Sequence, residues 1–241
     1  MKKNNSLRNA SYNNPPCTLE NEQFYGYELD PEQKVFRDAI WNPEKLVIVC
    51  NSKAGTGKNL VALGTANLLY QYGFYNGIVY IISPTQEQRQ GFIPGDPDQK
   101  NAPYMGPLLD ALMALDINPY TAIKNFEDMK AAKSGDAYID FVSDTYLRGT
   151  NYENKVIIID EAQNFYFDIL KKTITRVHDN CKLIIMGHDK QCDLIKKPER
   201  SGFVPYINAY KRSNDSRVSI CELKTNHRGW ISTFADDVEF E

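Results

Sequence analysis

Segment 52–59 constrains this chain more than any other, because it places a glycine-rich turn between an apolar run and the start of a helix. It reads Ser-Lys-Ala-Gly-Thr-Gly-Lys-Asn and lies directly after the run 46–50. A phosphate-binding loop requires this context, since glycines let backbone N–H groups face phosphate oxygens and the helix N-terminus adds positive potential. We expect Lys58 to reach the β and γ phosphates of a nucleotide, in a loop formed by Ala54, Gly55, Thr56, Gly57, Lys58 and Asn59.

Two positions depart from the usual pattern GxxxxGK[ST] of such loops. Ser52 replaces the first glycine, and Asn59 replaces the hydroxyl residue that ordinarily binds Mg²⁺. An amide oxygen can still bind Mg²⁺ or one of its waters, but it does not reproduce the geometry of a hydroxyl. The context favours nucleotide binding over the alternative, a glycine-rich turn that binds nothing.

Short apolar runs alternate with helical patterns along the rest of the chain. Continuous runs rich in β-branched residues are typical of strands covered by helices on both faces. The pattern therefore predicts an α/β fold with a parallel sheet sandwiched between helices. Asp30 is the expected N-cap of a first helix that begins at Pro31 and runs to about Trp41. We expect strands at 45–50, 77–82, 137–142, 155–159, 182–186 and 218–223, and further helices at 57–73, 104–115, 119–133 and 162–177.

Asp160 and Glu161 follow one of these buried strands, at residues 155–159. Ligands of open parallel sheets bind at the carboxyl ends of the strands. We expect Asp160 to hold Mg²⁺ through water and Glu161 to orient and deprotonate an attacking water. Alone, such a pair of acids is more often the solvated start of a helix. Together with a phosphate-binding loop in the same chain, the pair indicates a role in metal binding and catalysis.

Composition excludes several classes of protein. The 28 Lys and Arg against 31 Asp and Glu give a net charge of −3, so the whole molecule does not attract nucleic acid. The apolar runs are far shorter than the ~20 residues of a membrane span, and the N-terminus lacks the apolar core of a secretory signal. Five scattered cysteines argue against a disulfide framework and favour a cytoplasmic location. We expect residues 1–25 to form a flexible tail and residues 26–241 to form one domain.

The sequence Asp160-Glu161-Ala162-Gln163 resembles the acidic motif of superfamily one helicases and of the PhoH-like ATPases. The resemblance to the PhoH-like family is the closer one and covers roughly residues 27–230. It implies a single RecA-like P-loop NTPase domain that binds ATP with Mg²⁺. The motifs that carry it lie at 54–58, 91–96, 103–112, 147–149, 160–164 and 201–203.

The resemblance also implies roles for two glutamines. Residues 29–33 resemble the Q motif, in which Gln33 would pair with the adenine edge; a surface glutamine on a capped helix is the alternative. Residues 187–191 align with a segment in which Gln191 would sense the γ-phosphate. His188 stands where the family usually has Asp, which bears on metal geometry and turnover.

Arg228 is expected to neutralise charge on the γ-phosphate, because residues 223–228 resemble a helicase segment with that role. A solvated surface arginine is the alternative. We expect either that Arg228 folds back onto its own site or that a neighbouring copy supplies it, and family resemblance favours a hexameric ring. Arg148 is a second candidate for the contact between copies.

These expectations define a PhoH-like ATPase in which Lys58 and Arg228 stabilise phosphate charge, Asp160 and Asn59 organise Mg²⁺, and Glu161 activates water. The departures at Asn59 and His188 leave a second hypothesis open, a nucleotide-binding switch or scaffold with little hydrolysis. RNA or single-stranded DNA remains open as a partner. A motor needs two such domains, so a lone chain is not expected to act as one.

Overall fold

The computed structural model describes residues 15–20, 23–83, 104–124, 137–143, 151–194 and 200–236, together with Val238. The expected motifs at 91–96 and 147–149, with Arg148, lie outside these residues, as does the start of the expected tail, 1–14. No helix in the described ranges is long and apolar enough to cross a membrane.

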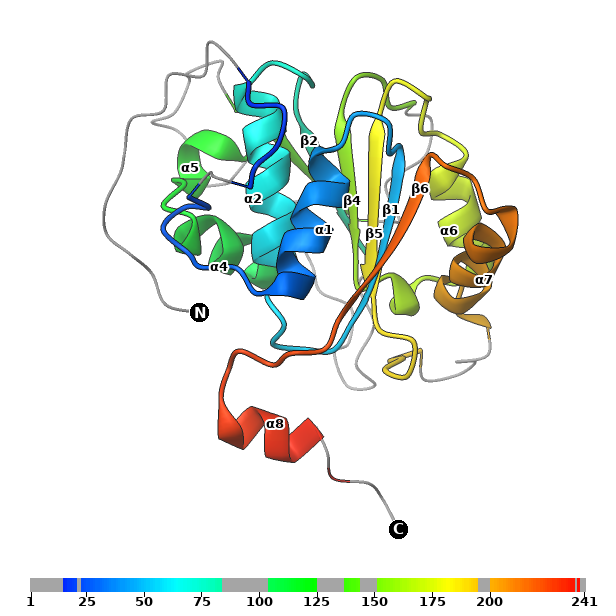
Figure 1. Cartoon of the computed structure of the whole chain (residues 1–241). Helices are drawn as coiled ribbons and strands as arrows, with labels where there is room; N and C mark the ends of the chain where they lie inside the picture. The colour runs from blue at the N-terminus through cyan, green and yellow to red at the C-terminus, as the bar shows by residue number, and fades with distance from the viewer. Residues whose placement is uncertain are drawn as a thin grey trace, which may run out of the picture.

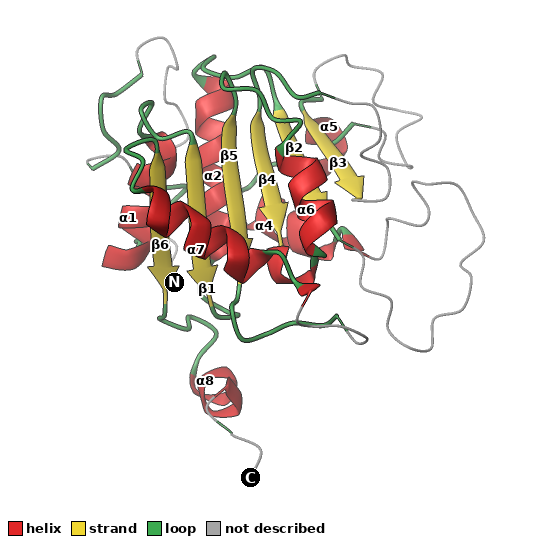
Figure 2. Cartoon of the chain, turned by 90° about the vertical axis from the view of Figure 1, so that its right-hand side faces the viewer, coloured by secondary structure: helices red, strands yellow, loops and turns green. Residues whose placement is uncertain are grey.

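Six parallel strands form one sheet in the order β3-β2-β4-β5-β1-β6 (Figure 2). All six expected strands are present, with ends shifted by one or two residues. This result confirms the parallel sheet that the apolar runs predict. The strands are β1 Val47–Ser52, β2 Ile78–Ile82, β3 Ile139–Ser143, β4 Val156–Asp160, β5 Lys182–Gly187 and β6 Val218–Leu223.

Helices cover both faces of the sheet, so the fold has three layers (Figure 1). Alternate side chains of a strand enter opposite cores: Val156 and Ile158 of β4 face one, and Ile157 and Ile159 face the other. The expected α/β sandwich is therefore confirmed. One face carries α1 Pro31–Trp41, α2 Lys58–Gln71, α4 Gly106–Ala114 and α5 Pro119–Ala122; the other carries α6 Phe167–Ile174 and α7 Phe203–Ser213.

The helix expected at 162–177 is divided into two pieces, which corrects that prediction. A short 3-10 turn, η3 Ala162–Asn164, precedes α6, and Phe165 between them is extended. The break has a physical cause, because Gln163 and Asn164 use their side chains for contacts with the segment after β5. Residues 125–133 of another expected helix lie outside the described residues.

Part of the segment expected as a tail packs against the core. Leu19 and Phe24 are buried, and Trp41 Nε1 donates a hydrogen bond to the carbonyl of Pro16. Apolar side chains bury surface wherever the chain can return to the domain. These described residues before position 26 therefore belong with the domain, although their Asn- and Pro-rich surroundings predict a tail.

Two further helices were not predicted from the sequence. One is α7, which packs beside α6. The other is α8 Trp230–Asp236, which projects away from the sheet at the C-terminal end of the described chain (Figure 1).

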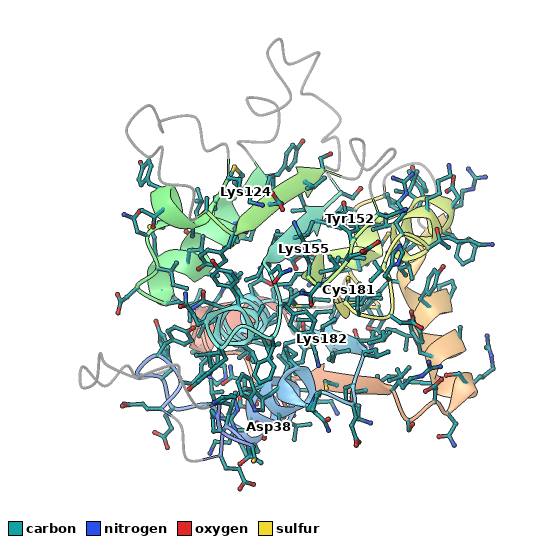
Figure 3. The ribbon with its side chains drawn as sticks, turned by 90° about the horizontal axis from the view of Figure 1, so that it is seen from above. Asp38, Lys124, Tyr152, Lys155, Cys181 and Lys182 are labelled. Atoms are coloured by element: carbon teal, nitrogen blue, oxygen red, sulfur yellow. The ribbon has the colours of Figure 1, made fainter. Side chains whose placement is uncertain are left out.

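A buried lysine stabilises the amino end of the sheet, opposite the carboxyl ends of the strands. Figure 3 shows Lys182 from this side. Its Nζ donates hydrogen bonds to the carbonyls of Asn42 and Lys45, at 2.7 and 2.8 Å, just after α1 ends. Burial lowers the pKa of Lys182 to about 8. Lys182 therefore ties the end of α1 to the sheet.

This low pKa predicts a pH dependence of stability. Between pH 8 and 10.5 the folded chain binds fewer protons at Lys182 than the unfolded chain does, so folding becomes more favourable as the pH rises. Relative to Lys182→Met, wild-type protein should gain up to about 3 kcal/mol across this range. Urea unfolding of both proteins at several pH values measures the difference. A difference that does not change with pH would contradict the prediction.

Candidate functional site

The predicted phosphate-binding loop leaves the carboxyl end of β1 and leads directly into α2. Gly55 and Gly57 have φ angles of +77° and +78°, a backbone region that side chains disfavour. No side chain of the described residues caps the N-terminus of α2, whose N-cap is Gly57. Its first backbone N–H groups therefore remain for an anion. Thr56 is buried, and its hydroxyl donates to the carbonyl of Lys53.

Lys58 and Glu161 form an ion pair across the site, with Lys58 Nζ 3.0 Å from Glu161 Oε1. Burial lowers the pKa of Lys58, but the negative charges of Asp160 and Glu161 together raise it above its ordinary value. Burial likewise raises the pKa of Glu161, but the charge of Lys58 together with the hydrogen bonds from Gln163 and Lys58 outweighs burial, so the pKa of that carboxyl is lowered. Lys58 is therefore charged and lies against two acids.

Asp160 is fully buried at the end of β4 and accepts three hydrogen bonds. Its Oδ2 accepts from the Tyr80 hydroxyl and from Asn59 Nδ2, the latter at 2.8 Å, and its Oδ1 accepts from the backbone N–H of Glu161. Burial raises the pKa of Asp160, and Lys58 opposes the shift. These donors hold the carboxylate in one orientation.

The amide oxygen of Asn59 is a buried acceptor that the described residues leave without a hydrogen bond. Its nitrogen donates to Asp160 and, at 3.3 Å, to the Tyr80 hydroxyl, whereas Oδ1 is buried without a hydrogen-bond partner among the described residues. A buried polar atom without a partner is costly unless a ligand satisfies it. An amide oxygen beside a carboxylate is a donor set that Mg²⁺ accepts, so these residues fit a magnesium ion.

Gln163 connects the acidic strand end to the segment after β5. Its Nε2 donates to Glu161 Oε2 at 2.6 Å, and its Oε1 accepts from the backbone N–H of His188 at 3.0 Å. A Cβ atom at Gly187 would lie 2.7 Å from Gln163 Oε1, so only glycine leaves room for this bridge. Glu161 is therefore held from two sides, by Lys58 and by Gln163.

Gln191 lies exposed on the loop that follows β5, between the strands that carry the phosphate loop and the acids. The ring of His188 organises this loop, because its Nδ1 accepts from the backbone N–H groups of Lys190 and Gln191. The backbone N–H of Asp189 donates to Asn51 at the end of β1. The described contacts thus bring the loop to the site without fixing the Gln191 side chain there.

Gln33 connects the start of α1 to the phosphate loop. It is fully buried, its Oε1 accepts from the backbone N–H of Asp30, and its Nε2 donates to the carbonyl of Thr56 at 2.8 Å. Both ends of the amide thus form hydrogen bonds within the protein. Gln33 therefore attaches α1 to the phosphate loop.

Arg228 lies beside the phosphate loop of its own chain. The backbone N–H of the preceding residue, His227, donates to the carbonyl of Gly55 at 2.8 Å. A Cβ atom at Gly55 would lie 3.2 Å from Arg228 Cδ. Within one chain, the strand β6 is therefore followed by a segment that folds back beside the phosphate loop, as the first of the two expected placements requires.

Tyr80 and Gln163 are site residues that were not predicted. Tyr80 lies on β2, which pairs with β4 so that Ile82 is opposite Asp160 and Tyr80 is opposite Ile158. Side chains alternate along a strand, so Tyr80 shares a face with Asp160. Knowledge of how β2 pairs with β4 would have placed Tyr80 in the site. Gln163 could have been predicted because it belongs to the acidic motif at 160–163.

Fold and site together define a RecA-like P-loop NTPase. Among solved structures, the large terminase of bacteriophage HK97 has a similar fold, with a TM-score of 0.52 at 16% identity, covering 82% of this chain and 40% of the terminase. The model of the family described as PhoH-like protein matches residues 28–231. The chain belongs to the PhoH-like family.

Two curated relatives illustrate how the chain compares within this family. It is 36% identical over 222 residues to protein PhoH2 of Bacillus subtilis, covering 90% of this chain and 49% of PhoH2. It is 32% identical over 189 residues to a PhoH-like protein of Mycobacterium leprae, covering 78% of this chain and 50% of that protein. The chain thus spans about half the length of these relatives.

The bridge made by Gln163 predicts that Gly187→Ala destabilises the protein. The added Cβ would meet Gln163 Oε1 and, at 3.0 Å, the ring of Phe203. We expect a loss of about 1–3 kcal/mol in the free energy of unfolding, measured with urea. The matched control is Gly106→Ala, where none of the described residues lies within 4 Å of the added atom and the change should stay within about 0.5 kcal/mol. Equal stability of the two variants would contradict the prediction.

Proposed function

We propose that this chain binds ATP with Mg²⁺ and hydrolyses it to ADP and phosphate. The observation that carries the proposal is the meeting of Lys58, Asn59, Asp160 and Glu161 at the carboxyl edge of the sheet. A cation on a phosphate-binding loop, a free amide oxygen and a paired carboxylate are the groups that phosphoryl transfer to water needs. The family and fold support this assignment.

The backbone of Ala54, Gly55, Thr56 and Gly57 would hold the phosphates, together with the N-terminus of α2. Lys58 would turn from Glu161 toward the β and γ phosphates, since phosphate oxygens compete for the same ammonium group. This exchange has a chemical consequence. Lys58 lowers the pKa of Glu161 in the ligand-free site. Its departure would raise that pKa and make Glu161 a better base toward water.

Asn59 would present its Oδ1 to the metal, and Asp160 would hold the amide in that orientation and accept from metal-bound water. When bound, Mg²⁺ supplies charge neutralisation between the β and γ phosphates. Arg228 would add positive charge from beside Gly55, and Gln191 would report on the γ-phosphate from the loop after β5.

A nucleotide-binding switch with little hydrolysis is the second candidate. Two observations favour it. Lys58 and Gln163 both bind Glu161, which occupies the carboxylate that would act as the base, and position 59 carries an amide in place of a hydroxyl. Phosphate release by the purified chain separates the two candidates. ATP binding without turnover would favour the switch.

Partners and location are further parts of the proposal. We propose a reducing, cytoplasmic setting, which fits five cysteines that form no disulfide in the described part of the chain. RNA or single-stranded DNA would couple to hydrolysis, and stimulation of phosphate release by oligonucleotides tests this coupling. Assembly into a homo-oligomer, with a hexameric ring as the favoured form, is tested by light scattering with and without ATP.

Glu161→Gln should keep ATP binding and lower turnover by about 10²–10⁴-fold, because the amide has the same shape but cannot accept a proton. Lys58→Ala should remove detectable ATP binding in calorimetry. The matched control is Glu153→Gln, since Glu153 is an exposed acid that pairs with His178, away from the site. Unchanged turnover in Glu161→Gln would show that another group is the base.

Asn59→Leu should remove the effect of Mg²⁺ on ATP affinity, because leucine has a similar shape but no oxygen. We expect a loss of about 10–100-fold in affinity when Mg²⁺ is present, and little change when it is absent. Calorimetric titration with and without MgCl₂ measures both. Asn59→Thr, unlike Asn59→Leu, keeps an oxygen at this position and should therefore retain the effect of Mg²⁺ on ATP affinity. An Asn59→Leu protein that still responds fully to Mg²⁺ would refute the metal role.

A further inference from the structure

The segment between β6 and α8, residues 224–229, passes across the phosphate loop at the carboxyl end of the sheet (Figure 1), and we name it the C-terminal strap. Three hydrogen bonds fix it to the domain. The Lys224 N–H donates to Glu32 Oε2 at 2.7 Å, the His227 N–H donates to the Gly55 carbonyl at 2.8 Å, and His227 Nε2 lies 2.7 Å from Asp30 Oδ2.

At Gly55 the strap lies directly against the phosphate loop. A Cβ atom there would lie 2.6 Å from Asn226 Oδ1 and 3.2 Å from Arg228 Cδ. That same Asn226 oxygen accepts from the backbone N–H of Arg228 at 2.8 Å and so fixes the local turn. The loop therefore needs glycine for its positive φ and also for contact with the strap.

Asp30 divides its two oxygens between two tasks. Oδ1 caps α1 by accepting from the backbone N–H of Gln33, and Oδ2 holds the ring of His227. The Gln33 side chain in turn donates to Thr56 in the phosphate loop. The N-terminus of α1 thus holds both the loop and the strap, and so fixes their relative position.

Arg228 is left with its charge free for a ligand. Within the described ranges no acidic side chain forms an ion pair with it, whereas its backbone is held by Asn226 and by the preceding residue, His227. An exposed guanidinium beside a phosphate-binding loop suits a phosphate oxygen.

We propose that Asp30 and His227 form a clasp that positions Arg228 at the phosphate loop of its own chain. The inference rests on the proposed ATP hydrolysis, in which Arg228 contacts the γ-phosphate. Asp30 and His227 are then positioning residues, which act through Arg228 and touch no substrate.

A double-mutant cycle tests the clasp. Asp30→Ser keeps an N-cap, because serine is among the preferred capping residues, but removes the oxygen that holds His227. His227→Ala removes the other partner, and His227→Gln keeps a hydrogen-bonding group. Each change is made in wild-type and in Arg228→Ala protein, and kcat and KM for ATP are measured.

We expect Asp30→Ser and His227→Ala to lower kcat by about 10²-fold with little change in KM, since a misplaced charge loses transition-state contact. His227→Gln should recover part of the loss. In the Arg228→Ala background neither change should lower kcat further, because the clasp acts only through that arginine. Equal losses in both backgrounds, or no loss in either, would overturn the inference.

A second measurement does not depend on turnover. The chain has two tryptophans, and Trp230 directly follows the strap. In a Trp41→Phe background, loss of the clasp should lower the fluorescence anisotropy of Trp230, because the strap and α8 move more freely. Unchanged anisotropy would overturn the clasp. Wild-type protein without turnover would instead overturn the proposed function, and the anisotropy would still show whether Asp30 and His227 hold the strap.

Discussion

The ammonium group of Lys58 is the charge on which the carboxyl edge of the sheet depends. It lies 3.0 Å from Glu161, and its charge opposes the rise that burial causes in the pKa of Asp160. Without Lys58, two adjacent acids would lie in a poorly solvated position without this compensating charge. Breaking one partner of a buried pair leaves the other charge uncompensated. The ligand-free site therefore keeps Lys58 on the acids, and a polyphosphate must offer that cation a better partner. Under the proposed function, nucleotide binding and the release of Glu161 from Lys58 would therefore be one event.

The positions of the phosphate loop and of the C-terminal strap depend in a similar way on the N-terminus of α1. Asp30 caps the helix, and Gln33, which completes the capping box, donates to Thr56. The same carboxylate holds His227 of the strap. A helix start usually satisfies only its own backbone groups. Here it also binds the phosphate loop and the C-terminal strap, the two segments that would touch phosphate. The start of α1 therefore fixes the position of one segment relative to the other.

Much of this architecture could be predicted from local sequence. Continuous β-branched runs predict all six strands, because strands buried on both faces need apolar side chains at successive positions. The Asp30-Pro31 pair predicts the start of α1, because helix capping depends on neighbouring residues. The role of Gln33 could not be obtained in this way. Its hydrogen bond to the Thr56 carbonyl depends on how α1 packs on the loop. The break after Glu161 and the position of Arg228 likewise depend on contacts between distant segments.

The departure at Asn59 is best understood together with Tyr80. A hydroxyl at position 59 can serve as a metal ligand on a short side chain, whereas asparagine is longer and carries a donor as well as an acceptor. In this site the donor is satisfied by Asp160, which the Tyr80 hydroxyl holds from β2, and the oxygen is left unpaired. Tyr80, Asp160 and Asn59 therefore behave as a coupled set. Asn59 can present an oxygen because its other end is anchored, so the substitution is compatible with a working metal site when Tyr80 and Asp160 are retained.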